Sequence, residues 1–237
     1  MQYMGSKNRI AKHIVPIIQS YINEDTKGYL EPFVGGANVI DKIEHNNKIG
    51  CDIHKELIAL LSESQTDRVF PVTISEEEYI KVKNNRSEYE DWYVALTGFC
   101  GGFGSVYFSG FAGKVNDKRD RPAEAISNIQ KQRKNLYGIK FLHKSFVDLP
   151  KEQISGYVIY CDPPYEGTAK YKTNPFPHAE FWNWVREISK NNIVLVSEYN
   201  APDDFECIWE KEHKTGLQIG NQQVRIEKLF IHRNVNY

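Results

Sequence analysis

The segment over residues 28–61 constrains the fold more than any other part of this chain. Its hydrophobic pattern predicts, in order, a strand, a glycine turn, a helix, a strand and a helix over residues 28–33, 35–36, 37–44, 48–52 and 55–61. The second strand ends in an acidic residue, Asp52. This order is typical of the first part of a doubly wound α/β domain with a mostly parallel sheet.

The same alternation returns in the last hundred residues. Residues 140–146 suit a strand, and buried strands are predicted at 156–162, from its continuous apolar run, and at 193–197, with a helix over 178–190. Two further segments, 205–210 and 224–232, predict a terminal strand pair, and a first helix is expected to begin near Ser6. The chain therefore predicts one α/β domain interrupted in its middle.

The interruption covers residues 63–135, where the alternation of strands and helices is lost. It contains a charged helical stretch from Glu76, a glycine-rich aromatic segment over 98–113, and a helix over 122–137. We predict a catalytic domain made of residues 1–62 and 136–237, with residues 63–135 inserted as a target-recognition region.

The net charge of −1 excludes a chain that is basic as a whole, so any nucleic-acid surface must be local. Residues 111–140 hold eight Lys and Arg against three Asp and Glu, an excess of +5. Lysines and arginines in such a stretch contact phosphates, which position a nucleic acid without reading its sequence. The basic side chains assigned this DNA-binding role are Lys114, Lys118, Arg119 and Arg121.

Cysteine usage and hydropathy indicate the compartment. The four cysteines form no C-x-x-C pair and lack histidines at zinc spacing, so we expect reduced thiols and no metal site. No run approaches the roughly 20 apolar residues of a membrane helix, and the first residues lack the apolar core of a signal peptide. The expected location is the cytoplasm, or the host cytoplasm if the protein is phage-encoded.

The motif Asp162-Pro163-Pro164-Tyr165 directly follows a predicted buried strand. Ligands of open α/β sheets bind beyond the carboxyl ends of the strands. Two prolines stiffen the backbone and remove two donors, leaving a carboxylate, carbonyls and an aromatic face around a small pocket. Such a pocket suits a planar ring that carries an amino group. The alternative interpretation is a turn that ends the strand and packs its tyrosine.

Three further motifs are weaker when taken singly. The glycines in Glu31-Pro32-Phe33-Val34-Gly35-Gly36 let a ligand approach the backbone, or form only a tight turn. Asp52 is placed to bind ribose hydroxyls, or to cap the next helix. Tyr3-Met4-Gly5-Ser6-Lys7 is either a binding motif or a frayed end with a solvated lysine.

Together the four motifs resemble the Dam family, the D12 class of DNA adenine N-6 methyltransferases, and they occur in that family's order along nearly the whole chain. The resemblance implies a Rossmann-like methyltransferase fold and S-adenosyl-L-methionine as the cofactor. It also implies the residues that contact or line the cofactor site: Tyr3, Lys7, Glu31, Phe33, Gly35, Asp52, Phe146 and Asp162. The sequence has Ser145 where the family often has an acidic residue before the aromatic, so Phe146 either packs on the cofactor's adenine or belongs to the core.

The expected reaction is methyl transfer to the exocyclic amino group of adenine in a specific sequence of double-stranded DNA. Acceptors on Asp162 and Pro163 draw the amino nitrogen toward tetrahedral geometry, and Tyr165 stacks on a base flipped out of the duplex. The glycine-rich aromatic segment enters a groove or fills the gap left by that base, or else packs its rings on the catalytic domain.

Other functions remain open at this stage. The same motif chemistry serves cytosine or RNA amines, and a catalytically silent DNA-binding paralogue is a second alternative. A dehydrogenase fits less well, because residues 33–36 lack the full G-x-G-x-x-G fingerprint. A cognate restriction endonuclease is a possible functional partner, and no obligate protein partner is implied.

Overall fold

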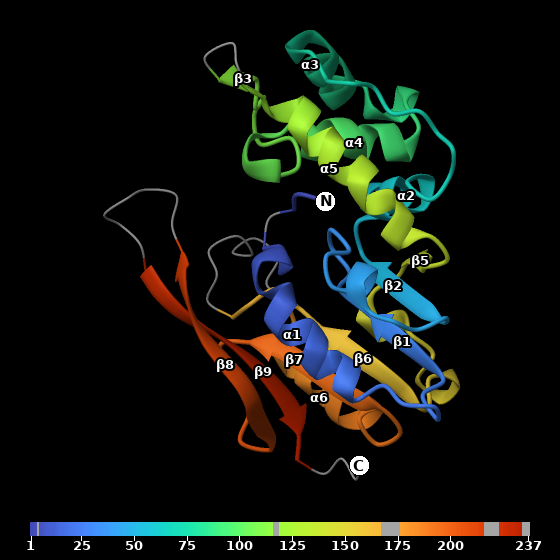
Figure 1. Cartoon of the computed structure of the whole chain (residues 1–237), viewed down its shortest axis with the longest axis vertical. Coiled ribbons are helices and arrows are strands. Elements are labelled where there is room, and N and C mark those ends of the chain that lie inside the picture. Colours follow the sequence, from blue (N-terminus) through green and yellow to red (C-terminus); the bar gives the residue numbers. More distant parts are fainter. Residues whose placement is uncertain (4, 116–118, 167–175, 216–222, 234–237) are drawn as a thin grey trace. The chain divides into compact units, whose positions relative to one another are not determined.

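The computed structural model describes residues 1–3, 5–115, 119–166, 176–215 and 223–233 (Figure 1). Contacts within the chain group these residues into two compact units, each described here by itself. Unit 1 comprises Met1–Val15 and Val34–Lys144, and unit 2 comprises Pro16–Phe33 and Ser145–Tyr237. The boundary falls inside helix α1 (Asn8–Ser20), which runs without a break through Pro16.

Unit 1 contains a pair of parallel strands, β2 (Lys48–Asp52) and β5 (Lys140–His143). Helix α2 (Lys55–Glu63) follows β2, and the ring nitrogen of His54 accepts a hydrogen bond from the Leu57 N–H to cap it. The strand and helix therefore begin and end close to the residues that the pattern predicted.

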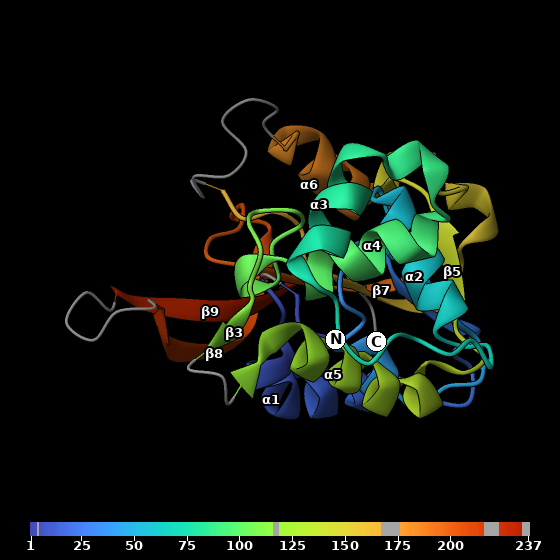
Figure 2. The ribbon, with the colours of Figure 1, turned by 90° about the horizontal axis from the view of Figure 1, so that it is seen from above.

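Three longer helices build the rest of unit 1: α3 (Glu76–Asn84), α4 (Asp91–Cys100) and α5 (Arg121–Leu136) (Figures 1 and 2). Helix α4 contacts α2, α3 and α5, which explains why it is buried on all sides. Short elements connect them: the 3-10 turns η2 (Arg86–Glu88) and η3 (Phe103–Ser105), and the antiparallel pair β3 (Lys114–Val115) and β4 (Arg119–Asp120).

Unit 2 is built on five strands in the order β1-β6-β7-β9-β8. The first three, β1 (Gly28–Glu31), β6 (Tyr157–Cys161) and β7 (Ile193–Glu198), are parallel. The last two, β9 (Gln223–His232) and β8 (Phe205–Thr215), form an antiparallel hairpin, drawn in orange and red in Figure 1. The central strands β6 and β7 are almost wholly buried, as their continuous apolar runs predict.

Helix α6 (His178–Ile188) contributes the aromatic part of the unit 2 core. The apolar face predicted for it is buried, with Phe181, Trp182, Val185 and Ile188 all inaccessible or nearly so. The Trp182 ring lies 4.7 Å from the Phe205 ring at the start of β8, measured between centroids. Two 3-10 turns, η4 (Phe146–Asp148) and η5 (Lys151–Gln153), precede β6.

One predicted helix is largely absent. Residues 37–44 form only the 3-10 turn η1 (Ile40–Lys42). Ala37 has a φ of 55°, a left-handed conformation that a right-handed helix does not contain. The Asn38 side chain donates to the Met1 carbonyl at 2.9 Å and to the Ser6 hydroxyl at 2.8 Å, so long-range contacts replace the expected helical turn.

The predicted α/β class with parallel strands is confirmed, and the division into a catalytic domain and an insert stays a prediction. Among the residues described, no helix is both long enough and apolar enough to span a membrane.

The buried Asn192 ties the end of α6 to the beginning of β6. Its amide nitrogen donates to the carbonyls of Ile154 and Ile188, both at 2.9 Å, and its oxygen accepts the Tyr157 N–H at 2.9 Å. We predict that Asn192→Ala lowers the free energy of unfolding by about 2–4 kcal/mol, because three hydrogen bonds from a buried side chain to the backbone are lost. Urea denaturation measures this, with the exposed neighbour Asn191→Ala as the control. Equal effects of the two substitutions would contradict the assignment.

Candidate active site

The Asp162-Pro163-Pro164-Tyr165 motif begins where strand β6 ends, in the middle of three parallel strands of unit 2. Pro163 and Tyr165 are buried, whereas Asp162 and Pro164 are half-buried. The two neighbouring strands also end in acids, β1 in Glu31 and β7 in Glu198. Because parallel strands have their carboxyl ends at one edge of a sheet, the three acids gather at that edge.

Electrostatics within unit 2 confirm this clustering. Burial raises the pKa of the Tyr160 phenol well above its ordinary value, and the charges of Asp162, Glu31 and Glu227 raise it further. Tyr160 is therefore a neutral residue surrounded by carboxyl groups, and its hydroxyl lies 2.8 Å from the Ser197 hydroxyl. Such a concentration of negative charge suits a cationic ligand.

Glu198 is the carboxyl most affected by this environment. Burial, together with the charges of Asp162 and Glu166, raises its pKa to about 7, although the N–H groups of Tyr199 and Glu166 oppose the rise. Those N–H groups donate to its two oxygens at 2.7 and 3.3 Å. Since Glu166 follows Tyr165 directly, Glu198 anchors the backbone of the motif at its far end.

Tyr165 is held through both its hydroxyl and its ring. The hydroxyl donates to Glu227 Oε2 at 2.9 Å, and the ring meets the Tyr199 ring edge-on with centroids 4.6 Å apart. Burial first, then the charges of Asp162 and Glu227, raise the pKa of the phenol well above its ordinary value, so Tyr165 remains a donor.

Aromatic rings lie beside the end of β1 in the same unit. The Phe33 ring, which is half-buried, is 5.6 Å from the Phe146 ring and 5.7 Å from the Phe176 ring, measured between centroids. Phe146 also packs on Phe181 and Trp184 and is only 4% exposed. Phe146 is therefore a core residue, and Phe33 is the more accessible ring of the pair that the sequence assigned to the cofactor.

Glu31, the remaining unit 2 residue assigned to the cofactor, is buried at the end of β1 with 3% exposure. Its Oε1 accepts the hydroxyl proton of Tyr29 at 2.7 Å, so a neighbouring side chain satisfies one of its oxygens.

Unit 1 brings the other predicted residues together around the turn that follows β1. Asp52 ends β2, and its two oxygens accept the Gly35 N–H at 3.1 Å and the His54 N–H at 3.0 Å. Burial raises the pKa of this carboxyl, and the same hydrogen bonds lower it in part. The helix cap is His54 and not Asp52, so Asp52 holds the glycine turn instead of capping α2.

Tyr3 covers that turn. A Cβ on Gly35 would lie 3.1 Å from the Tyr3 ring, and Gly35 has a φ of +47°, which favours glycine. The ring also packs on Phe99 at 5.4 Å. Lys7, just before α1, is only 8% exposed. Tyr3 and Lys7, the two side chains of the N-terminal motif that were assigned to the cofactor, are thus packed within unit 1.

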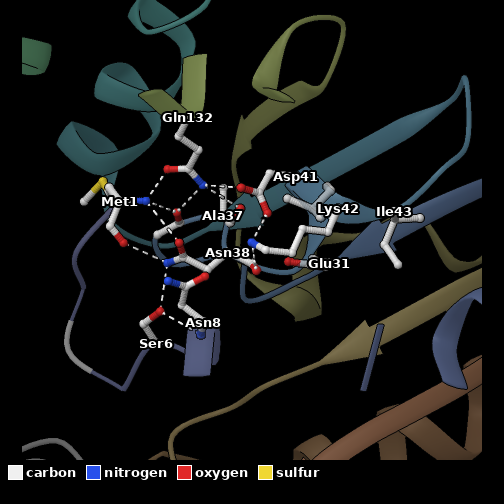
Figure 3. Close-up of polar contacts among 12 residues, drawn as sticks. Met1, Ser6, Asn8, Glu31, Ala37, Asn38, Asp41, Lys42, Ile43 and Gln132 are labelled. Carbon is white, nitrogen blue, oxygen red and sulfur yellow. Dashed lines mark hydrogen bonds and ion pairs between the residues drawn. The ribbon is translucent and has the colours of Figure 1, made fainter. Parts of the chain in front are cut away.

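Helix α5 fastens the glycine turn from its other side (Figure 3). The amide nitrogen of Gln132 donates to the carbonyls of Gly36 at 3.3 Å and Ala37 at 2.9 Å, and to Asp41 Oδ2 at 2.9 Å. The α-amino group of Met1 donates to the Gln132 oxygen and to the Gly36 carbonyl. Burial lowers the pKa of that amino group to about 5.

The glycine-rich aromatic segment packs most of its rings inside unit 1. Tyr107 meets His54 edge-on at 4.6 Å and Phe99 at 5.0 Å. A Cβ on Gly98 would lie 2.5 Å from the Tyr107 ring, which explains the glycine there. Phe103 is 52% exposed, and Arg121 lies over its ring at 5.1 Å. Most of the segment is therefore packed core, and Phe103 is the ring exposed for an external contact.

The basic side chains assigned to DNA differ in their surroundings. Lys114 is exposed, whereas Arg119 donates to both oxygens of Glu124, at 2.8 and 2.9 Å. Lys118 lies outside the described residues. Contact of these residues with DNA stays a prediction.

A family model described as D12 class N6 adenine-specific DNA methyltransferase matches residues 3–183. The chain belongs to this family. The match includes all four motifs, so the family recognised from them is confirmed. The chain is 25% identical over 239 residues to the DNA N-6-adenine-methyltransferase of Escherichia phage P1. That alignment covers 89% of this chain but 30% of the phage protein, so the chain spans less than a third of that relative's length.

Solved structures of methylases are also similar to this family member. A putative methylase from Haemophilus influenzae is 12% identical with a TM-score of 0.38, covering 95% of this chain and 97% of that one. An rRNA methylase from Streptococcus thermophilus is 8% identical with a TM-score of 0.39, covering 94% and 96%. These scores are too low to support an inference about the chain.

Sequence reasoning missed Glu198 and Glu227. Glu198 carries the same signal as Asp162, an acid at the end of a buried apolar strand. Glu227 falls on the face of β9 that buries Leu229 and Ile231, so an acid interrupts an apolar alternation there. Both signals are visible in the printed sequence once the strands are recognised.

The raised pKa of Glu198 predicts a pH dependence of stability. Its ordinary value is 4.5, so between pH 4.5 and about 7 the folded protein holds a proton that the unfolded chain has lost. This contribution to stability is present below pH 4.5 and is lost as the pH rises through about 7. When the pH is raised from 5 to 8, the free energy of unfolding should fall by about 2–3 kcal/mol less in Glu198→Gln than in the wild-type protein. Urea denaturation at both pH values measures this.

The exposed Glu206→Gln on β8 is the control for removing one carboxyl from unit 2. If the Glu198 variant and the wild-type protein lose the same free energy between the two pH values, the protonated group is not Glu198.

Proposed function

We propose that this chain transfers a methyl group from S-adenosyl-L-methionine to the exocyclic amino group of adenine in double-stranded DNA. The observation that carries the proposal is the Asp162–Tyr165 motif at the carboxyl end of the buried strand β6, in a member of the D12 class. The acidic strand ends on both sides of it supply the negative charge that a reaction of a cationic methyl donor requires.

The residues present fit the cofactor's chemistry. Carboxylates suit its cationic and hydroxyl groups, and aromatic rings suit its adenine ring. The Asp52 carboxylate accepts backbone N–H groups, among them those of Gly35 and His54, and has a lone pair left for a ribose hydroxyl. In the proposal, the residues that contact the cofactor are Tyr3, Lys7, Glu31, Phe33, Gly35, Asp52 and Asp162. Phe146 supports Phe33 from the core.

The bound cofactor supplies an electrophilic methyl group. The chain's own residues prepare the nucleophile, since the lone pair of an adenine amino group is delocalised into the ring. The Asp162 carboxylate and the Pro163 carbonyl accept the two N–H groups and draw the nitrogen toward tetrahedral geometry. As the nitrogen gains positive charge, the same carboxylate stabilises it, and preorganised acceptors of this kind lower a barrier by several kcal/mol.

The base must leave the duplex to reach this loop, and the Tyr165 ring stacks on it. Basic side chains of unit 1, among them Lys114, Arg119 and Arg121, contact phosphates and position the DNA. Sequencing the modified bases in DNA from cells that express the protein tests the substrate and identifies the target site. Methylated cytosine without methylated adenine, or methylated bases in RNA but not in DNA, would contradict the proposal.

The charge on Asp162 is predicted to be essential. Asp162→Asn keeps the shape of the side chain but replaces an acceptor by a donor, so methyl transfer should fall about 100-fold or more. Tritium transfer from labelled cofactor into adenine-containing DNA measures it. Asp203→Asn, an exposed acid of unit 2, is the matched control, and thermal melting checks folding. Near-normal transfer by a folded Asp162→Asn protein would remove the motif from the catalytic site.

The Arg119–Glu124 ion pair predicts that DNA binding is restrained. Glu124→Gln frees the Arg119 guanidinium for a phosphate contact, so the affinity for DNA should rise several-fold. The slope of log affinity against log salt concentration should become steeper by about one unit. Adding Arg119→Ala to the Glu124→Gln variant should remove this gain, because the freed guanidinium is then absent. Fluorescence anisotropy across a salt series measures both slopes, with Glu24→Gln as the control for net charge. An unchanged slope in Glu124→Gln would place Arg119 away from DNA.

A further inference from the structure

Glu227 is an acid in an apolar position. It is 8% exposed on β9, on the face where Leu229 and Ile231 are 0% and 1% exposed. A buried carboxyl is unfavourable unless hydrogen bonds compensate for its lost hydration. The Tyr165 hydroxyl, 62 residues away in the sequence, donates to it at 2.9 Å. Burying this carboxyl lowers the stability of the fold, and the group accepts a hydrogen bond from Tyr165, the tyrosine of the Asp162–Tyr165 motif.

The two partners differ in rigidity. Glu227 lies within a strand that is paired on both sides, because β9 pairs with β7 through Glu198↔Lys228 and with β8 through Lys211↔Glu227. Tyr165 follows the end of β6 and lies outside any strand. The hydrogen bond therefore joins a loop residue to the sheet, and the sheet sets the position of the ring.

Other contacts define the same orientation. The Tyr199 ring, edge-on at 4.6 Å, limits rotation of the Tyr165 ring, and Glu198 accepts the backbone N–H of Glu166 at 3.3 Å. These contacts hold the backbone and one side of the ring. The hydroxyl end of Tyr165 is held by Glu227.

We propose that Glu227 is a positioning residue for methyl transfer, which holds the Tyr165 ring by its hydroxyl in the orientation that stacks on the target base. The inference rests on the proposed function in one respect, the contact between Tyr165 and the base. The inference changes the expected effect of Tyr165→Phe on the rate of methyl transfer. Stacking on the base needs only the ring, so stacking alone predicts a mild effect. The phenylalanine variant, however, also loses the hydrogen bond that anchors the ring and leaves the Glu227 carboxyl without this donor.

The test is a double-mutant cycle of Tyr165→Phe and Glu227→Leu, since leucine has no acceptor for the Tyr165 hydroxyl. Methyl transfer is measured on a duplex that contains the methylated site identified by sequencing. Each single variant should lower kcat about tenfold, the loss of one hydrogen bond to a charged group, with KM for the cofactor within twofold. The double variant should be no slower than the slower single variant, because both changes remove the same interaction. Glu210→Leu, at an exposed acid of β8, is the control for loss of charge in the hairpin.

A second readout separates positioning from general stability. A duplex with 2-aminopurine at the target adenine reports stacking of the flipped base by its fluorescence. Its emission in the complex should rise in Glu227→Leu toward the level of Tyr165→Ala, because the ring no longer covers the base. If Glu227→Leu melts at a markedly lower temperature, Tyr165→Phe, which removes only a hydroxyl, must still reproduce the kcat and emission changes.

Two outcomes overturn the inference: kcat within twofold of wild type in Glu227→Leu, or effects of the two single variants that multiply in the double variant. A failure of the proposed function looks different. In that case Tyr165→Ala itself transfers methyl groups at the normal rate, whereas failure of the Glu227 anchor leaves Tyr165→Ala strongly impaired.

Discussion

The parallel pairing of β1, β6 and β7 is the constraint on which the rest of unit 2 depends. It places Glu31, Asp162 and Glu198 at one edge of the sheet, each at or just after the end of its strand. Carboxyl groups in a buried setting repel one another and lose hydration, so each requires donors or a proton. The Tyr29 hydroxyl donates to Glu31, and backbone N–H groups donate to Glu198. Burial and the neighbouring carboxylates still raise the pKa of Glu198.

The same requirement orders the segment just after β6. Glu198 accepts the Glu166 N–H, and Glu227 accepts the Tyr165 hydroxyl proton, so both carboxyl groups take a donor from this segment. The segment is thereby attached to β7 through Glu198 and to β9 through Glu227. In unit 1, Asp52 orders the glycine turn in the same way, by accepting the Gly35 N–H. Acids at strand ends therefore support the backbone around them by accepting its N–H groups.

The elements that sequence reasoning missed are those that depend on distant contacts. Helix α4 shows no amphipathic period because α2, α3 and α5 surround it, and its Gly98 reads as a loop signal although it is there to admit the Tyr107 ring. The expected helix over residues 37–44 is shortened because Asn38 bonds to residues near the N-terminus. In both places, contacts with residues far away in the sequence override the local propensity, and a short stretch of sequence does not include those residues.

The sequence by itself determined the α/β class, the order of the motifs and the acids at the strand ends, because strand periodicity and turn chemistry are local properties of the chain. It also predicted Asp162 and Tyr165 as the catalytic residues of the motif. Only the tertiary structure decided which groups support them. Glu227 meets Tyr165 because the register of β9 against β7 turns that one side chain inward, and a one-residue shift would turn it to the other face.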